Sequence, residues 1–149
     1  MSDQRTRAHK PSLLVVDDEI DIRDMIRRHF MFLGYDVATA TDGVDALKQM
    51  ATKRFEVVIS DITMPVMDGV QLLRAVREEY PMTRCIMITG YVTMENVLCC
   101  MRKGADTCVF KPIRDISELE RAVEHAVDQL KQWQEKIKYL LAMKPSEDV

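Results

Sequence analysis

The sequence predicts a doubly wound α/β fold, with a five-stranded parallel sheet in the strand order 2-1-3-4-5, helices on both faces and an extended last helix. Three observations predict it. Short segments rich in β-branched residues alternate along the chain with longer segments of helical periodicity. The connections between them are short, and right-handed crossovers then make the strands parallel. Several strand segments are apolar almost throughout, which is typical of strands covered on both faces.

The predicted strands are short runs bounded by polar or turn-forming residues. The segments LLVV, VVIS and CIMIT are the most continuously apolar, which predicts burial on both sides. In chain order, the predicted strands are Ser12–Val16, Asp36–Thr39, Val57–Ser60, Arg84–Thr89 and Thr107–Phe110.

The helix boundaries carry capping residues at the start and glycine or proline at the end. Between these signals, apolar residues recur at spacings of three and four, as on the buried face of a helix. The signals are Gly34 after the first helix, Asp42 before the second, Asp68 with Gln71 before the third, Pro81 after the third, Thr93 before the fourth and Gly104 after it.

The last helix is predicted to be the longest. Ser117 and Glu120 have the spacing of a capping box. Residues 118 to 141 would make a helix of about 36 Å, which Pro145 limits, and a small sheet can cover only about its first half. Apolar residues recur along it at alternating spacings of 4 and 3: Leu119, Val123, Ala126, Leu130, Trp133, Ile137 and Leu140.

The outer part of this apolar stripe predicts self-association, because it would be exposed on a monomer. A two-stranded coiled coil, and hence a homodimer, is the simplest way to bury it. The faces of the domain would contribute, since about three heptads are marginal alone. Docking on a partner protein and folding back onto the domain are the alternatives. The outer stripe consists of Leu130, Trp133, Ile137 and Leu140.

Composition and charge are those of an ordinary globular protein. The 149 residues suffice for one domain without disulfide or metal staples. With 47% hydrophobic and 30% charged residues, the chain is too apolar for disorder, and a net charge of −3 gives no reason to expect a nucleic-acid-binding surface. No apolar run exceeds five residues, which argues against a membrane span, and the polar first ten residues do not resemble a secretory signal. We expect a cytoplasmic protein.

The domain organisation follows from these patterns. We expect a disordered lead over residues 1–11, one domain over 12–130, a projecting helical extension over 131–143 and a disordered tail over 144–149. The cysteines lack the spacing of metal ligands and are expected to be reduced thiols that act as small apolar side chains. They are Cys85, Cys99, Cys100 and Cys108.

Polar side chains stand at the carboxyl ends of four predicted strands. Asp17-Asp18-Glu19 follows the first strand, Asp61 the third and Lys111 the fifth, and Thr89 ends the fourth. These strands are neighbours in the predicted order, so the side chains converge on one crevice. Clustered carboxylates repel each other unless a cation is present, and Mg²⁺ suits one or two carboxylates while leaving room for a phosphoryl oxygen. Each residue alone has an ordinary explanation, such as a helix cap for Asp18, but their combination indicates a site.

At these positions the chain resembles the receiver domain of two-component response regulators, which has a flavodoxin-like fold. The resemblance covers about Ser12 to Leu130. It depends on the acidic pair Asp17-Asp18, the segment VVISDITMPVMDG around Asp61, the segment MITG with Thr89, and Lys111-Pro112 after GADTCVF.

The resemblance implies a phosphoacceptor switch. Asp61 would accept a phosphoryl group from a histidine kinase or phosphotransfer protein, and Mg²⁺ would be held by Asp17, Asp18, Asp61 and the backbone carbonyl of Thr63. Lys111 would pair with the phosphoryl group, Thr89 would hydrogen-bond it, and the Lys111–Pro112 peptide would be cis. The face made by the fourth helix, the fifth strand and the fifth helix would then change and control a downstream protein or an output domain. No substrate would be turned over beyond the acyl phosphate itself.

Two features depart from the family pattern. Cys108 stands where an aromatic switch residue is usual, three positions before Lys111, and we expect Phe110 to lie on the wrong strand face to replace it. Thr63 and Tyr91 hold the positions that, as the resemblance implies, border the path of water to the acyl phosphate. Since neither offers a carboxylate or an amide to orient water, the sequence predicts slow dephosphorylation.

Three other functions remain open. A degenerate receiver could act only as an interaction scaffold, although its acidic pair, Asp61, Thr89 and Lys111 are intact. An Asp-nucleophile phosphatase would need a second acid two residues after Asp61, where Thr63 stands. A flavin-binding module would place a cofactor phosphate against the acidic cluster, which would repel it.

Overall fold

Strands and helices alternate along the whole described chain. The computed structural model describes residues 10–64, 66–90, 93–111 and 115–143. Most predicted strand limits agree with the structure, and the second and third strands each extend one residue further than predicted. The elements are β1 (Ser12–Val16), α2 (Ile20–Phe32), β2 (Asp36–Ala40), α3 (Gly43–Met50), β3 (Val57–Asp61), α4 (Gly69–Glu79), β4 (Arg84–Thr89), α5 (Met94–Arg102), β5 (Thr107–Phe110) and α6 (Ile116–Met143).

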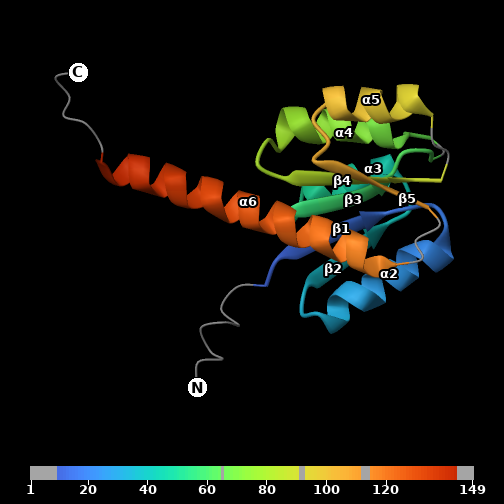
Figure 1. Ribbon diagram of the computed structural model, residues 1–149, viewed down its shortest axis with the longest axis horizontal. Coiled ribbons are helices and arrows are strands. Elements are labelled where there is room, and N and C mark those ends of the chain that lie inside the picture. Colours follow the sequence, from blue (N-terminus) through green and yellow to red (C-terminus); the bar gives the residue numbers. More distant parts are fainter. Residues whose placement is uncertain (1–9, 65, 91–92, 112–114, 144–149) are drawn as a thin grey trace.

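The strands form one parallel sheet in the order β2-β1-β3-β4-β5, which confirms the predicted fold class (Figure 1). The apolar segments of β1, β3 and β4 occupy the middle of this sheet and are almost entirely buried. Their in-register pairs include Val16 with Ser60 and Asp61 with Ile88. Residues that follow these strands therefore meet at one edge of the sheet.

Helices cover both faces of the sheet. Figure 1 shows α3, α4 and α5 on one side, with α2 and α6 on the other. Alternate residues of each strand point to opposite faces of the sheet, so Val58 belongs to one apolar core and Ile59 to the other. Each face therefore has its own apolar core, and the sheet is held rigidly between two helical layers.

The predicted caps of three helices are present. The Asp42 carboxylate accepts from the amide of Asp45 at 2.8 Å, and Thr93 accepts from Asn96 at 3.1 Å. Asp68 and Gln71 form a reciprocal capping box, as predicted from their spacing. After α2 and α5 the chain turns through Gly34 and Gly104, whose φ angles are +101° and +98°. Glycine adopts this left-handed conformation without the steric cost of a side chain.

The predicted capping box of α6 is wrong. The helix begins at Ile116, so Ser117 already lies inside its first turn. The carboxylate of Asp115 accepts hydrogen bonds from both the amide and the hydroxyl of Ser117. The acid just before the helix thus accepts a hydrogen bond from an amide of the first turn. Ser117 cannot cap in this way, because it lies inside that turn.

The helix α6 runs along the sheet and then continues well beyond it (Figure 1). Its sheet-covering residues, Leu119, Val123, Ala126 and Val127, are buried as predicted. Leu130, predicted to belong to the exposed stripe, is only 2% exposed. The domain therefore covers α6 for about one turn beyond Val127, and the exposed stripe begins at Trp133.

Among the described helices, none combines the length and the apolar character that a membrane span needs. The described cysteines are free thiols, with Cys85 and Cys100 buried and Cys99 and Cys108 half-buried. The predicted disordered ends lie outside the described residues except for Lys10 and Pro11.

Candidate functional site

The candidate site lies at the carboxyl edge of the sheet. Asp17 follows β1, Asp61 ends β3 and Lys111 follows β5. The amide of Lys111 donates to the carbonyl of Thr89 at 2.8 Å, which extends the pairing of β4 and β5 by one residue. The parallel register therefore delivers these side chains to the same place, as predicted.

The ammonium of Lys111 is the centre of the site. Its Nζ lies 2.7 Å from Oε1 of Glu19, 3.0 Å from Oδ2 of Asp61 and 3.2 Å from Oδ2 of Asp17. The Asp17, Asp61 and Lys111 side chains are at most 11% exposed, whereas that of Glu19 is 57% exposed. One cation thus faces three carboxylates, two of them buried.

Burial and charge act in opposite directions on these groups. Burial raises the pKa of the Asp17 carboxyl above its ordinary value, against the opposing effects of the Glu19 amide and Lys111. Burial by itself would lower the pKa of Lys111, but hydrogen bonds to Glu19 and Asp61 and the charges of Asp17 and Asp61 raise it well above its ordinary value. Lys111 is therefore a permanent cation at neutral pH.

The oxygen atoms present fit a hard divalent cation. Asp17, Glu19 and Asp61 each place a carboxylate oxygen within 4.8 Å of the other two. Oδ2 of Asp17 is buried and accepts no hydrogen bond from the described residues, although the Lys111 ammonium is near it. A buried anionic oxygen of this kind is a suitable Mg²⁺ ligand, together with Asp61.

Two predicted metal ligands are placed differently from these carboxylates. Asp18 is exposed and does not belong to the three-carboxylate group. Thr63 is exposed, and its amide donates to Oδ1 of Asp61 at 3.3 Å, which leaves its carbonyl available on the loop after β3. Glu19 was expected in this crevice together with the acidic pair, but its sequence position alone gave it no role, and its contact with Lys111 is seen only in the structure.

The start of α4 supports the segment that presents Asp61. The amide of Gly69 donates to the carbonyl of Ile62 at 2.7 Å. A β-carbon at Gly69 would collide with the carbonyl oxygen of Asp61 and would lie 2.7 Å from the α-carbon of Ile62. Only glycine permits this close approach of two backbone segments. The start of α4 thereby supports the backbone of Asp61 and Ile62.

The predicted switch residues are only partly described. Thr89 is fully buried at the end of β4, while Tyr91 and the Lys111–Pro112 peptide fall outside the described residues. Cys108 is half-buried and packs against the apolar cluster that contains Cys100 of α5. A small thiol therefore occupies the position expected of a rotating ring.

The expectation for Phe110 is wrong. In the parallel register Met87 pairs with Cys108 and Thr89 pairs with Phe110. Residues two apart on a strand point to the same face, so Phe110 shares the face of Cys108 and stands beside Thr89. Its ring is half-exposed.

This fold with this acidic site defines a class of protein, the receiver domains of two-component response regulators. The chain belongs to this family, because residues 13–124 match the model of the response regulator receiver domain. That match ends at residue 124, whereas α6 continues to Met143.

Three relatives illustrate the range of proteins with similar segments. The chain is 35% identical over 128 residues to the regulatory protein AtoC of Escherichia coli, a match that covers 86% of this chain and 27% of AtoC. It is 36% identical over 101 residues to the sensor histidine kinase RcsC of E. coli, covering 68% of this chain and 11% of RcsC. The solved structure of the chemotaxis protein CheY4 of Vibrio cholerae superposes with a TM-score of 0.75 at 34% identity, over 79% of this chain and 99% of CheY4. The chain thus spans about a quarter of the length of AtoC and about a tenth of the length of RcsC, but it matches nearly all of CheY4.

Proposed function

We propose that the chain is a phosphoacceptor switch that receives a phosphoryl group on Asp61 from a histidine kinase or a phosphotransfer protein. The observation that carries this proposal is the Lys111 ammonium, which lies 3.0 Å from Asp61 and 3.2 Å from Asp17 at the carboxyl edge of the sheet. A carboxylate nucleophile, a fixed cation and an acidic metal-binding surface thus meet at one point, which is the arrangement that phosphoryl transfer requires.

The reaction follows from these groups. A carboxylate oxygen of Asp61 attacks the phosphorus of a phosphohistidine on the donor, the P–O bond forms, and the P–N bond breaks as the imidazole leaves. Lys111 balances charge on the transferring oxygens, and the Thr63 amide orients the Asp61 carboxylate. A Mg²⁺ ion held by Asp17, Asp61 and the Thr63 carbonyl, with Asp18 directly or through water, would supply further positive charge there. The chain turns over no other substrate.

The acyl phosphate then acts on the neighbouring strand ends. The hydroxyl of Thr89 hydrogen-bonds the new dianionic group, and the segment after β4 shifts toward Asp61. This shift biases a two-state equilibrium in the surface formed by α5, β5 and α6. Cys108 of β5 packs against the apolar cluster that contains Cys100 of α5, and so connects the two elements within that surface.

The partners belong to a cytoplasmic signalling pathway. Because RcsC is a sensor histidine kinase that contains a similar segment, a kinase or phosphotransfer donor is the partner that supplies the phosphoryl group. Since the chain matches about a quarter of AtoC, the output is carried by further segments of a longer protein or by a separate downstream protein.

A small phosphodonor such as acetyl phosphate tests the assignment. Intact-protein mass spectrometry should show one added phosphoryl group in the presence of Mg²⁺, and none in the Asp61→Asn variant or after chelation. Asp45→Asn serves as the matched control, because Asp45 does not belong to the group of carboxylates around Lys111. Labelling of Asp61→Asn equal to wild type contradicts the proposal, and a protein that is never labelled supports the alternative of a degenerate receiver scaffold.

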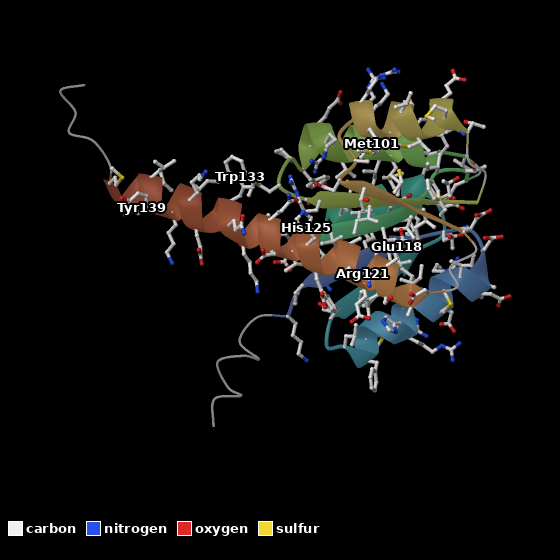
Figure 2. All side chains as sticks on the ribbon, in the orientation of Figure 1. Met101, Glu118, Arg121, His125, Trp133 and Tyr139 are labelled. Atoms are coloured by element: carbon white, nitrogen blue, oxygen red, sulfur yellow. The ribbon has the colours of Figure 1, made fainter. Side chains whose placement is uncertain are left out.

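We further propose that the projecting part of α6 forms a homodimer, as a two-stranded coiled coil. Trp133, Ile137 and Leu140 recur at coiled-coil spacing and are 51%, 41% and 57% exposed. Figure 2 shows Trp133 and Tyr139 on the part of α6 that extends beyond the domain. An isolated helix gains nothing from such side chains in water, so a second copy is the partner that buries them.

Sedimentation tests the homodimer. Full-length protein should sediment as a dimer at tens of micromolar, and a version ending at Lys131 should be a monomer. This end point keeps Leu130, which the domain needs because it is buried. Two monomeric species, with and without acetyl phosphate, would contradict the homodimer.

A further inference from the structure

The Lys111 ammonium contacts the same carboxylates that could hold a divalent cation. It lies within 3.2 Å of an oxygen on each of three carboxylates, those of Asp17, Glu19 and Asp61. Two positive charges in contact with the same oxygens repel each other strongly in a buried site. Entry of a cation at Asp17 and Asp61 therefore requires the ammonium to withdraw from both of them.

Glu19 differs from the other two carboxylates. It makes the shortest contact to Lys111, 2.7 Å, and its side chain is 57% exposed and thus free to move. It stands at the N-cap position of α2, yet its side chain makes no capping hydrogen bond. Its amide instead donates to Oδ1 of Asp17 at 2.9 Å, which fixes its backbone beside the buried acid.

We propose that Glu19 is a positioning residue that takes over the Lys111 ammonium when a divalent cation occupies Asp17 and Asp61. This inference depends on the proposed function and deepens it, because it explains how lysine and cation share one acidic site. With Glu19 present, the ammonium keeps a carboxylate partner as it withdraws. Without it, the ammonium has only Asp17 and Asp61 as partners among the described carboxylates, and it competes with the cation for both.

A double-mutant cycle tests this role, with Mg²⁺ affinity measured by titration calorimetry on the full chain. Glu19→Gln should weaken Mg²⁺ binding about tenfold in the wild-type background, which is the size of a single outer partner's effect on metal affinity. In the Lys111→Met background the same substitution should weaken Mg²⁺ binding by no more than about twofold, because the competing ammonium is gone. Such a coupling between two residues is what the cycle isolates.

Asp18→Asn is the matched control. It removes one carboxylate charge from the neighbouring residue, and Asp18 does not belong to the group around Lys111. Its effect on Mg²⁺ affinity should be the same in both backgrounds. Circular dichroism confirms that each variant is folded.

Glu19→Asp covers the case in which Lys111→Met does not fold. It keeps the charge but shortens the side chain by one methylene, so it should weaken Mg²⁺ binding nearly as much as Glu19→Gln. Wild-type affinity in Glu19→Asp, or an equal or larger effect of Glu19→Gln in the Lys111→Met background, would overturn the role of Glu19 while leaving Asp61 phosphorylation intact. Wild-type protein that binds no Mg²⁺ would overturn both this role and the metal-dependent function.

Discussion

At the scale of single residues, the segment after Asp61 contains a strained backbone. Val66 has a φ of +69°, in the left-handed region where a β-branched side chain is crowded. Its side chain is largely exposed, so packing does not compensate for the strain. Such a conformation costs about 1–3 kcal/mol. The loop after Asp61 is therefore less stable than it would be with an unstrained residue at position 66.

Replacing Val66 by glycine should stabilise the protein. Relief of the strain outweighs the extra chain entropy of glycine, about 0.5–1 kcal/mol, so the free energy of unfolding should rise by about 1 kcal/mol. Urea denaturation measures it. Val44→Gly is the control, because Val44 lies in the first turn of α3, where glycine should destabilise the fold. A Val66→Gly variant less stable than wild type would contradict the strain.

A second residue-scale prediction concerns the buried thiol of Cys85. Burial raises its pKa from 9.0 to about 12. Above pH 9 the unfolded chain releases this proton while the folded chain keeps it, so stability is complete below pH 9 and falls as the pH rises toward 12. The loss from this thiol is about 1.4 kcal/mol per pH unit.

Urea unfolding at several pH values between 8 and 10.5, under reducing conditions, measures this decline. The Cys85→Ala variant should be less stable than wild type at pH 8 but should lose stability less steeply as the pH rises. Cys99→Ala, at a half-buried position, is the control. Parallel curves for wild type and Cys85→Ala would show that the thiol titrates alike in both states.

At the scale of elements, α6 carries one apolar stripe through a buried and an exposed part. Its first half covers the sheet, and the stripe then continues without a change of spacing into the projecting half. The spacing of apolar residues is the same in both halves, so periodicity alone cannot show where the domain ends. Burial changes between Leu130 and Trp133.

Two alanine substitutions separate the halves of α6. Leu130→Ala removes a buried side chain and should cost about 2–5 kcal/mol of stability. Ile137→Ala should change the stability of the monomer by less than about 0.5 kcal/mol, because this side chain is 41% exposed and lies beyond the buried part of α6. Dilute protein should be used for denaturation, and concentrated protein for sedimentation, where only Ile137→Ala should weaken association while leaving the fold unchanged. Equal losses of stability from the two substitutions would contradict this division.

At the scale of the whole molecule, we expect cation binding at the acidic site to be linked to folding. The three clustered carboxylates face a single ammonium, so the folded protein holds a net negative site. A ligand that binds only the folded state stabilises it by about 2.7 kcal/mol at a hundredfold excess over its dissociation constant. Unfolding should therefore depend on Mg²⁺.

Thermal unfolding followed by circular dichroism checks this linkage. The melting temperature should rise with Mg²⁺ concentration and return to its starting value with chelator, at constant ionic strength. Asp17→Asn should lose the increase, because it removes a buried ligand oxygen. Asp128→Asn, an exposed acid on α6, should keep it. An equal increase in both variants would assign the effect to general screening rather than to the site.

The sequence by itself determined the sheet, its strand order and the meeting of Asp17, Asp61, Thr89 and Lys111 at one edge. Apolar runs specify buried strands, right-handed crossovers between them favour a parallel sheet, and 2-1-3-4-5 is a common strand order of such doubly wound folds. A parallel sheet then brings every strand's carboxyl end to the same side. These features depend on local periodicity and on the direction of the chain, and both can be read from the sequence alone.

Tertiary structure alone decided which side chains complete the site and where the domain ends. Glu19 reaches Lys111 and Asp18 does not, because the direction of each side chain depends on where α2 begins and on the bond between the Glu19 amide and Asp17. Leu130 is buried because the domain covers α6 further than the stripe could reveal. Contacts between residues 92 apart in the sequence, such as Lys111 with Glu19, arise only when the packed layers fix their separation in space.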